Sequence, residues 1–327
     1  ESFVLRPMNC PHHMMIYANR MHSYKDLPIR IGEIAHDFRF EASGTLKGIE
    51  RGRHFCQNDA HLFVTPEQIE DEFTKVVDLI FSTYKDFGIT NYRCVLSLRD
   101  PENKEKYHDD DEMWNKAENA LREVMDSLGI EYTEEIGEAA FYGPKVDINA
   151  KNVYGKEDTM ITIQWDALLA EQFDMYYIDE NGEKQRPYII HRTSMGCYER
   201  TLAWLIEKYA GMFPTWLCPE QVRVIPISDK YNDYAAKVEA QLKEANIRCS
   251  VDGRSEKMGY KIREARLERV PYMLIVGAKE EEEGKVSVRS RYLGDEGMKE
   301  LGEFIDFIKE EIKNKTIRKI EVQEEKK

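Results

Sequence analysis

Two prolines within six positions, Pro214 and Pro219, mark the point where the pattern of the sequence changes. Before them, strand-like stretches are separated by long amphipathic helices, and after them short strands and helices alternate. Because proline interrupts both helices and sheets, such a segment suits a connection between domains. We therefore predict two domains, residues 1–217 and residues 218–327.

The first part contains three helix signals. Thr65-Pro66-Glu67-Gln68 is a capping box with proline at the first helical position, and Gly88 follows where the apolar spacing ends. A second apolar face ends just before Gly129. We expect helices over residues 65–88, 111–128 and 196–209.

Strand-like stretches lie between these helices. One pair, residues 175–179 and 186–192, flanks Asn181-Gly182, a dipeptide that favours a type I′ hairpin turn. Hairpins produce antiparallel pairing, so we predict an α+β domain in which helices pack on one side of an antiparallel sheet. Its other strands are expected at residues 92–98, 140–150 and 160–166.

The alternation in the second part is typical of a small α/β domain with a largely parallel sheet. Its strands are expected at residues 222–227, 247–251, 272–276 and 285–289. Its helices are expected at residues 231–245, 258–267 and 298–312.

Charge and cysteine usage limit the classes of function. The net charge is −14, so a nucleic-acid partner would need a local basic patch. The apolar runs are far shorter than the roughly 20 residues that cross a bilayer, so no membrane role is expected. The six cysteines form no CxxC pair, which favours reduced thiols in a cytoplasmic protein. The chain starts at Glu1 without a signal-peptide pattern, and we expect it to begin within a domain.

Three widely separated residues could bind a metal ion: Cys10, His61 and His191. One thiolate and two imidazoles form a donor set that zinc accepts, with a position left for another ligand. The spacing alone does not bring them together, and three unrelated side chains are the simpler interpretation of it.

Two further clusters could bind phosphate. Arg39, Arg51 and Arg53 flank a connection rich in small residues, and guanidinium groups suit phosphate oxygens. Glu41 beside them could accept a hydrogen bond from an exocyclic amine. Solvated arginines on an edge strand are the alternative. Glu199-Arg200 stand near the start of the third expected helix, where a helix N-terminus favours anions.

Several motifs follow one another along nearly the whole chain. They are Met8-Asn9-Cys10-Pro11, Arg39-Phe40-Glu41, Gln57-Asn58-Asp59-Ala60-His61, Phe141-Tyr142-Gly143-Pro144-Lys145, Ile190-His191-Arg192, Glu199-Arg200, Phe213-Pro214-Thr215-Trp216-Leu217, Gly259-Tyr260-Lys261-Ile262-Arg263 and Arg269-Val270-Pro271-Tyr272-Met273. In this order and spacing the chain resembles the threonyl-tRNA synthetase family of class II aminoacyl-tRNA synthetases. The resemblance implies a class II catalytic core that lacks its first motif, followed by an anticodon-binding domain.

The resemblance also implies roles for individual residues. One Zn²⁺ would be bound by Cys10, His61 and His191 and would hold the amino and hydroxyl groups of threonine. Threonine would also contact Met8, Gln57, Asp59 and Tyr142. ATP, bound with Mg²⁺, would contact Arg39, Glu41, Arg51, Phe55, Gln164 and Arg200. The residues expected next to the reacting groups are Arg39, Arg200 and Lys145.

The implied activity is that of a threonine–tRNA ligase, which forms threonyl-adenylate and transfers threonine to the 3′ end of tRNA(Thr). Anticodon bases would be read by Arg263, Glu280 and Arg289. Residues 254–269 carry a local net charge of +3, from six basic and three acidic side chains, which agrees with an RNA-binding role. The first motif builds the dimer interface in this family, so a homodimer is expected only of a full-length protein, and the activity of this chain by itself is left open.

Some residues near the expected site depart from the family pattern. Thr193, Cys197 and Glu50 stand where alanine, serine and an apolar residue are usual. Asp158-Thr159 also differs from the family, which usually has a glutamine here that contacts the ATP ribose. Our hypothesis is that these changes alter ATP affinity or inhibitor sensitivity and leave threonine selection intact.

Two alternatives to the ligase interpretation are open. One is a paralogue of the synthetases that senses threonine or binds RNA as a regulator. The other is a related class II enzyme for proline or histidine, which the expected zinc ligands and Asp59 oppose.

Overall fold

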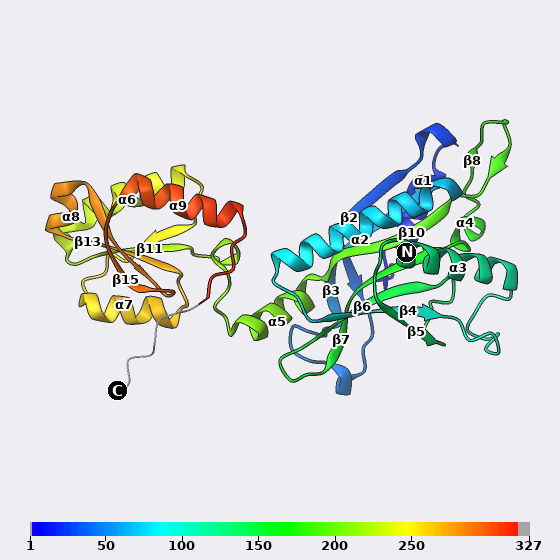
Figure 1. Ribbon diagram of the computed structural model, residues 1–327, viewed down its shortest axis with the longest axis horizontal. Helices are drawn as coiled ribbons and strands as arrows, with labels where there is room; N and C mark the ends of the chain where they lie inside the picture. The colour runs from blue at the N-terminus through cyan, green and yellow to red at the C-terminus, as the bar shows by residue number, and fades with distance from the viewer. Residues whose placement is uncertain (1, 320–327) are drawn as a thin grey trace. The chain divides into compact units, whose positions relative to one another are not determined.

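The computed structural model describes residues 2–319, which form two compact units divided between Glu207 and Lys208 (Figure 1). The sequence placed the boundary later, after Leu217. The difference arises because the proline-containing segment packs within the second unit. The side-chain amide of Gln221 donates to the carbonyl oxygen of Thr215 at 3.0 Å, and the Thr215 hydroxyl donates to the buried Glu311. None of the described helices is long and apolar enough to cross a bilayer.

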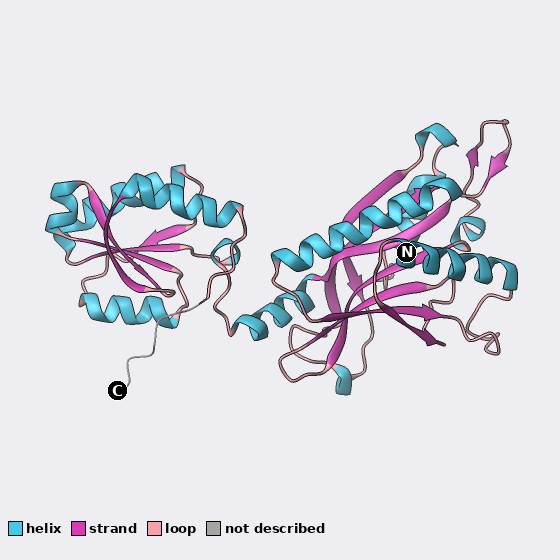
Figure 2. Ribbon diagram, in the orientation of Figure 1, coloured by secondary structure: helices cyan, strands magenta, loops and turns pink. Residues whose placement is uncertain are grey.

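The first unit is built on a seven-stranded sheet (Figure 2). All neighbouring strands pair antiparallel except β4 and β5, which confirms the predicted α+β class. The strand order across the sheet is β2 (Ile29–Phe38), β3 (His54–Val64), β10 (Tyr188–Cys197), β7 (Glu157–Asp166), β6 (Lys145–Lys151), β4 (Tyr92–Leu98) and β5 (Tyr132–Ile136).

The helices with strong capping and spacing signals are present. A 3-10 turn at Pro66–Gln68 leads into α2 (Ile69–Asp86), and the Thr65 N–H donates to the Gln68 side chain at 3.1 Å, as the capping box predicts. The other two predicted helices are α3 (Asp111–Ser127) and α5 (Tyr198–Tyr209). Gly88 and Gly129, which follow α2 and α3, both have positive φ angles.

Two helices of this unit are not predicted from the sequence: α1 (Cys10–Ala18) and α4 (Leu169–Gln172). Met14 and Tyr17 of α1 are buried against Phe63 and Ile189. Because side chains alternate along a strand, these contacts put α1 on the face of β3 and β10 that also carries the two histidines of the expected metal site. The start of α1, which holds Cys10, is therefore attached to that face.

The predicted hairpin is shorter than expected. β8 (Tyr177–Ile178) pairs with β9 (Lys184–Gln185), and β1 (His22–Ser23) lies parallel to β8. Of the turn dipeptide only Gly182 has a positive φ, so the turn is not type I′. The chain leaves the hairpin at Pro187, which lacks the N–H that a ladder requires, and continues as β10 in the main sheet. The strand expected at residues 140–150 likewise begins only after Pro144.

The second unit has a five-stranded sheet in the order β12 (Cys249–Val251), β11 (Val222–Pro226), β13 (Tyr272–Val276), β14 (Lys285–Ser290) and β15 (Gly294–Glu300). β11 is parallel to both its neighbours, whereas β13–β14 and β14–β15 are antiparallel. The expectation of a largely parallel sheet is wrong, because the connections between β13 and β14 and between β14 and β15 are too short for the crossover that a parallel pair needs. Its helices are α6 (Asn232–Glu244), α7 (Met258–Leu267), α8 (Ala278–Glu283) and α9 (Leu301–Lys313), of which α8 is not predicted.

Candidate active site

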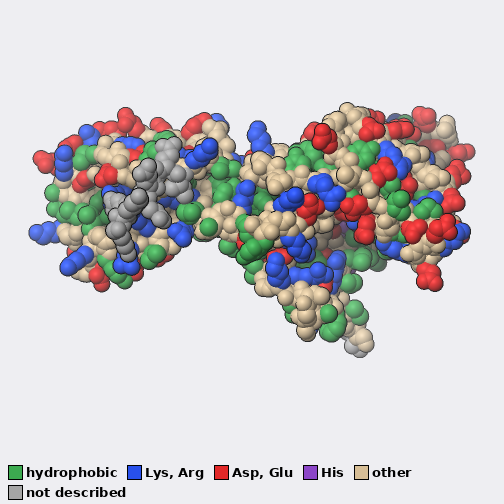
Figure 3. All heavy atoms as spheres, turned by 60° about the horizontal axis from the view of Figure 1, so that its bottom comes forward, with side chains coloured by type: hydrophobic (Ala, Val, Ile, Leu, Met, Phe, Trp, Pro, Cys, Tyr) green, Lys and Arg blue, Asp and Glu red, His purple; other side chains and the backbone are tan. Residues whose placement is uncertain are grey.

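A cavity of about 340 Å³ lies on the first unit, lined by residues from β3, β7, β10 and the starts of α1 and α5. Figure 3 shows Lys and Arg side chains gathered on one face of this unit, although the chain as a whole is acidic. The lining includes nearly all residues that the resemblance assigns to the ligands: Met8, Cys10, Arg39, Glu41, Arg51, Phe55, Gln57, Asp59, Tyr142, Gln164, His191 and Arg200.

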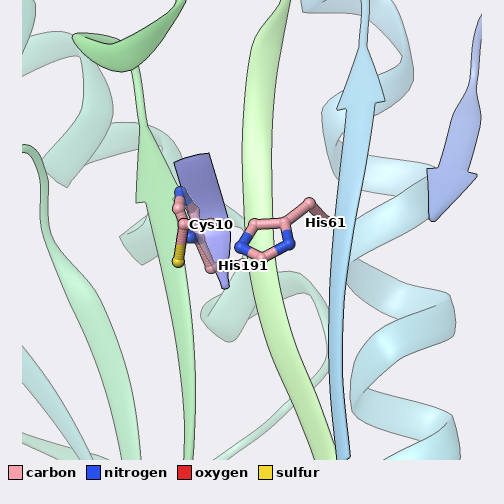
Figure 4. Close-up of side chains that lie close together, drawn as sticks. All are labelled: Cys10, His61 and His191. Atoms are coloured by element: carbon pink, nitrogen blue, oxygen red, sulfur yellow. The ribbon is translucent and has the colours of Figure 1, made fainter. Parts of the chain in front are cut away.

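The three expected metal ligands converge beside this cavity (Figure 4). One donor atom from each of Cys10, His61 and His191 lies within 4.8 Å of the others. The two histidines are register partners on β3 and β10, and their rings meet edge to face at 4.5 Å. His61 is fully buried, and its Nε2 has no hydrogen-bond partner among the described residues. Buried nitrogens without partners, next to a thiol, fit a bound zinc ion.

A series of interacting side chains, Arg6, Glu33 and His13, determines which ring nitrogen of His61 faces the other two expected metal ligands. Arg6 pairs with Glu33 and, against the effect of burial, lowers the pKa of that carboxyl, so Glu33 only accepts hydrogen bonds. The Nε2 of His13 lies 3.3 Å from Glu33, and the Nδ1 atoms of His13 and His61 are 2.7 Å apart.

The directions of these hydrogen bonds follow from the chemistry. Burial lowers the pKa of His13, which is therefore neutral, donates from Nε2 to Glu33 and accepts at Nδ1. His61, whose pKa burial also holds well below the usual range, must then donate from Nδ1. Its Nε2 is left with a free lone pair, which is the state that a metal ligand needs.

His191 is oriented from the opposite direction. Its Nε2 lies 2.8 Å from a carboxylate oxygen of the fully buried Asp166. Burial alone would lower the pKa of His191, but Asp166 and the sulfur of Cys10 outweigh it and raise the pKa to about 10. Asp166 thus holds the ring through Nε2, so that Nδ1, which has no hydrogen-bond partner in the described chain, is the atom left for a ligand. A metal ion bound there would displace the proton that the raised pKa keeps on Nδ1.

Polar groups next to these histidines could bind a small amino acid. Asp59 is only 8% exposed, and burial raises the pKa of its carboxyl to about 6. The Tyr142 hydroxyl donates to Gln164 at 2.6 Å, and the Tyr142 ring stacks on His191 at 5.1 Å. The buried hydroxyl of Thr193, one of the departures from the family pattern, has no partner among the described residues.

The predicted phosphate ligands lie on the connection between β2 and β3, rather than on strands. Arg39 donates to the carbonyl oxygen of Pro7 at 3.1 Å, and its guanidinium lies 5.1 Å from the centre of the Phe55 ring. Arg51 is paired with Glu41 at 3.1 Å. Arg53, the third arginine of the cluster, is not among the residues that line the cavity.

Of the two other residues expected next to the reacting groups, Arg200 lines the cavity and Lys145 does not. Lys145 does not line it, because its ammonium group pairs with Asp147, which also accepts from Ser97 and Thr162. A place for Lys145 next to the reacting groups stays a prediction. Arg200 lines the cavity and donates to the carbonyl oxygen of Thr159 at 3.3 Å.

The orienting residues of the histidines were missed by sequence reasoning. His13 follows Cys10 closely and Asp166 follows Gln164, so their positions offered a weak signal at most. Glu33 and Arg6 gave none, because their role depends on which side chains β2 and the preceding segment bring together.

In the second unit, the residues expected to read the anticodon lie on three elements: Arg263 on α7, Glu280 on α8 and Arg289 on β14. The carboxylate of Glu280 already accepts from the Gly277 N–H at 3.0 Å and the Ser287 hydroxyl at 2.7 Å. The segment around α7 exposes less positive charge than its composition suggests. Lys261 is buried and donates to two backbone carbonyls, so it contributes no charge to an RNA-facing surface.

Comparison with known proteins agrees with these observations. Residues 1–209 match the family described as tRNA synthetase class II core domain (G, H, P, S and T), and residues 221–311 match the family described as anticodon binding domain. A threonine–tRNA ligase of Staphylococcus aureus is 53% identical over 319 residues, which cover 97% of this chain and 50% of that protein. The chain thus spans about half the length of the curated relatives it matches.

Solved structures give the same result. The structure described as the RNA binding domain of threonyl-tRNA synthetase from Cryptosporidium parvum is 36% identical with a TM-score of 0.87, covering 93% of this chain and 76% of that one. A putative threonyl-tRNA synthetase from Aeropyrum pernix is 28% identical with a TM-score of 0.78, covering 95% of this chain and 74% of that one. The chain therefore belongs to the threonyl-tRNA synthetase family of class II aminoacyl-tRNA synthetases.

Proposed function

We propose that this chain forms the catalytic core and anticodon-binding part of a threonine–tRNA ligase, which activates threonine with ATP and transfers it to tRNA(Thr). The observation that carries the proposal is the convergence of Cys10, His61 and His191 beside a cavity that also holds Arg39 and Arg200. In the full-length protein we expect a homodimer that acts in the cytoplasm.

The reaction needs no nucleophile from the protein. The carboxylate of threonine attacks the α-phosphorus of ATP and pyrophosphate leaves, after which a ribose hydroxyl of the tRNA attacks the adenylate. Negative charge grows on the phosphoryl oxygens in the first step, so catalysis comes from alignment and fixed positive charge. Arg39 and Arg200 would supply that charge together with Mg²⁺, while Glu41 would accept from the adenine amine.

The donor set of the metal site fits zinc, which would supply Lewis-acid binding of the amino and hydroxyl groups of threonine. Asp59 would accept the hydrogen of the threonine hydroxyl. Valine lacks that hydroxyl and would leave the buried Asp59 without its partner, and a site built to bind a hydroxyl rejects such an analogue strongly. Serine keeps the hydroxyl and would still fit.

Threonine-dependent exchange of pyrophosphate into ATP tests the proposal on the full-length protein. We expect exchange with threonine, weaker exchange with serine, and almost none with valine or proline. Exchange with proline and none with threonine would refute the proposal. Threonine binding without any exchange would instead support the regulatory paralogue.

Restoring the family's glutamine at Thr159 should tighten ATP binding. Thr159 lines the cavity, and a longer amide side chain at this position could reach a ribose hydroxyl. One added hydrogen bond is worth about 0.5–1.5 kcal/mol, so Thr159→Gln should lower the KM for ATP by roughly 2- to 10-fold. Steady-state kinetics at saturating threonine measure this, with Thr159→Val as a control of similar shape. An unchanged KM for ATP would refute the idea.

Replacing His13 should weaken zinc binding without removing a ligand. His13→Ala leaves the Nδ1–H of His61 without its acceptor, so the ring is free to turn and its tautomer is no longer fixed. Changes of this kind typically cost about 10- to 100-fold in metal affinity. Competition with a chromophoric chelator measures the affinity directly. His12→Ala is the matched control, because His12 is the exposed neighbour. Equal affinity in both variants would show that His13 does not position His61.

A further inference from the structure

A second group of possible metal ligands lies outside the cavity, on the opposite face of the β2–β3 ladder. It consists of His36 on β2 and of His54 and Cys56 on β3. His36 and Cys56 are direct register partners, and His54 is two residues along the same strand. Side chains alternate along a strand, so these three point away from Phe55 and Gln57, which line the cavity. Neither the family comparison nor the reaction gives them a role.

The potential metal-ligand atoms of this group lie within 4.8 Å of one another. The Nδ1 of His36 lies 3.0 Å from the Nε2 of His54 and 3.5 Å from the sulfur of Cys56. The two imidazole planes are parallel, with centroids 5.2 Å apart, and the Phe38 ring stacks on His54 at 4.7 Å. A hydrogen on the Nδ1 of His36 can form a good hydrogen bond with only one of the two other atoms. The arrangement therefore brings together more potential metal-ligand atoms than one hydrogen bond requires.

Two of the three distances, from His36 to His54 and from His36 to Cys56, are close to those that zinc imposes, and the third pair of atoms lies within 4.8 Å. With Zn–N near 2.0 Å, Zn–S near 2.3 Å and tetrahedral angles, a nitrogen and a sulfur ligand lie about 3.6 Å apart and two nitrogens about 3.3 Å apart. The sulfur contact already has this length. The two nitrogens would need to separate by only about 0.3 Å, which a small rotation of two exposed side chains provides.

We propose that His36, His54 and Cys56 form a second zinc site, with three protein ligands and a water molecule in the position open to solvent. The site is distinct from the one beside the cavity, and it goes beyond the proposed ligase reaction. Zinc binding replaces the thiol proton of Cys56, which is released to solvent.

Such a site would link the two ends of the connection between β2 and β3. His36 precedes this connection and His54 follows it, and Arg39, Glu41 and Arg51 lie between them. Cys56 is also tied to α5, because its N–H donates to the Glu199 carboxylate at 2.9 Å. A metal clip at this place restricts the freedom of the segment that carries the expected ATP ligands.

Cobalt binding to the Cys10→Ser variant of the full chain tests the second site alone, because that variant has lost its thiolate at the first site. We expect one equivalent of Co²⁺ to give a thiolate-to-metal absorption band, and Cys10→Ser/Cys56→Ser to lose it. In the unsubstituted chain, His36→Gln/His54→Gln should reduce bound zinc from two equivalents to one. His108→Gln replaces an exposed histidine elsewhere and should leave both equivalents in place.

Two outcomes would overturn the proposal: no thiolate band in Cys10→Ser, or a band that persists when Cys56 is also replaced. Alkylation of Cys56 in the Cys10→Ser variant gives a second readout that leaves all three proposed ligands intact, since bound zinc should protect this thiol. No change of its labelling rate with zinc would also count against the site. If only the second site binds metal, the zinc part of the proposed function fails and this inference stands.

Discussion

Arg39→Gln is expected to lower the rate of threonyl-adenylate formation by about 100- to 1,000-fold, the usual cost of removing one charge-stabilising donor from a transition state. The structure holds this guanidinium in place before any substrate arrives, through the Pro7 carbonyl and the face of Phe55. Its charge is worth most when negative charge grows on the α-phosphate. The loss should therefore appear in kcat more than in the KM for ATP.

Rapid-quench measurement of adenylate formation separates this step from product release. Arg39→Lys keeps the charge but loses the planar fork, so we expect it to recover only part of the rate. Arg122→Gln, which removes an arginine paired with Glu134 away from the cavity, serves as the control for a general effect on the fold. A rate for Arg39→Gln within a few-fold of the unchanged protein would exclude a role for Arg39 in the transition state.

Loss of the first metal site should be equally severe. His61→Asn removes one of the three donors, and the remaining buried groups, including Asp59, are then left to bind threonine without the ion. We expect threonine-dependent pyrophosphate exchange to fall by more than the roughly 10- to 100-fold that loss of an orienting residue costs. Discrimination between threonine and valine should fall with it.

The measurement needs zinc and magnesium to be controlled separately. Dialysis against a zinc-selective chelator, with excess Mg²⁺ present in the assay, should reproduce the defect of His61→Asn, and added Zn²⁺ should restore only the unsubstituted protein. ATP binding should survive in both cases, because none of its expected ligands is a metal ligand and most of them, Arg39, Glu41, Arg51 and Arg200, lie on the 39–53 connection and α5. Full exchange activity in protein shown to contain no zinc would contradict the proposal.

The parts of the fold that could be predicted from sequence are those fixed by local signals. The capping box before α2 and the glycines after α2 and α3 each act within a few residues, and they determined those helix ends correctly. α1 gave only a weak local signal, Pro11 in its first turn. Its apolar residues do not share one face, since Met15 and Ile16 are exposed, and its burial depends on contacts with Phe63 and Ile189. The path of β10 also depended on pairing partners far along the chain.

The residues of the candidate site also divide into those that could be predicted from the sequence and those that could not. Residue types alone left Cys10, His61 and His191 unconnected, and only the resemblance joined them before the structure brought their donor atoms within 4.8 Å. The partners that set the orientation of the histidines, His13 and Asp166, required knowledge of distances and ring positions. Lys261 shows the opposite error. The sequence prediction included its charge in the net charge of residues 254–269, but the fold buries this side chain.

The segment around Thr215 has a practical consequence for work with the anticodon-binding part in isolation. Cutting the chain at Leu217 would remove the Thr215 hydroxyl from the buried Glu311 and the Phe213 carbonyl from Arg291. Two charged groups would lose hydrogen bonds inside the protein, which is among the costlier kinds of damage. Expression of a folded C-terminal piece for tRNA-binding assays should therefore start at Lys208 or earlier.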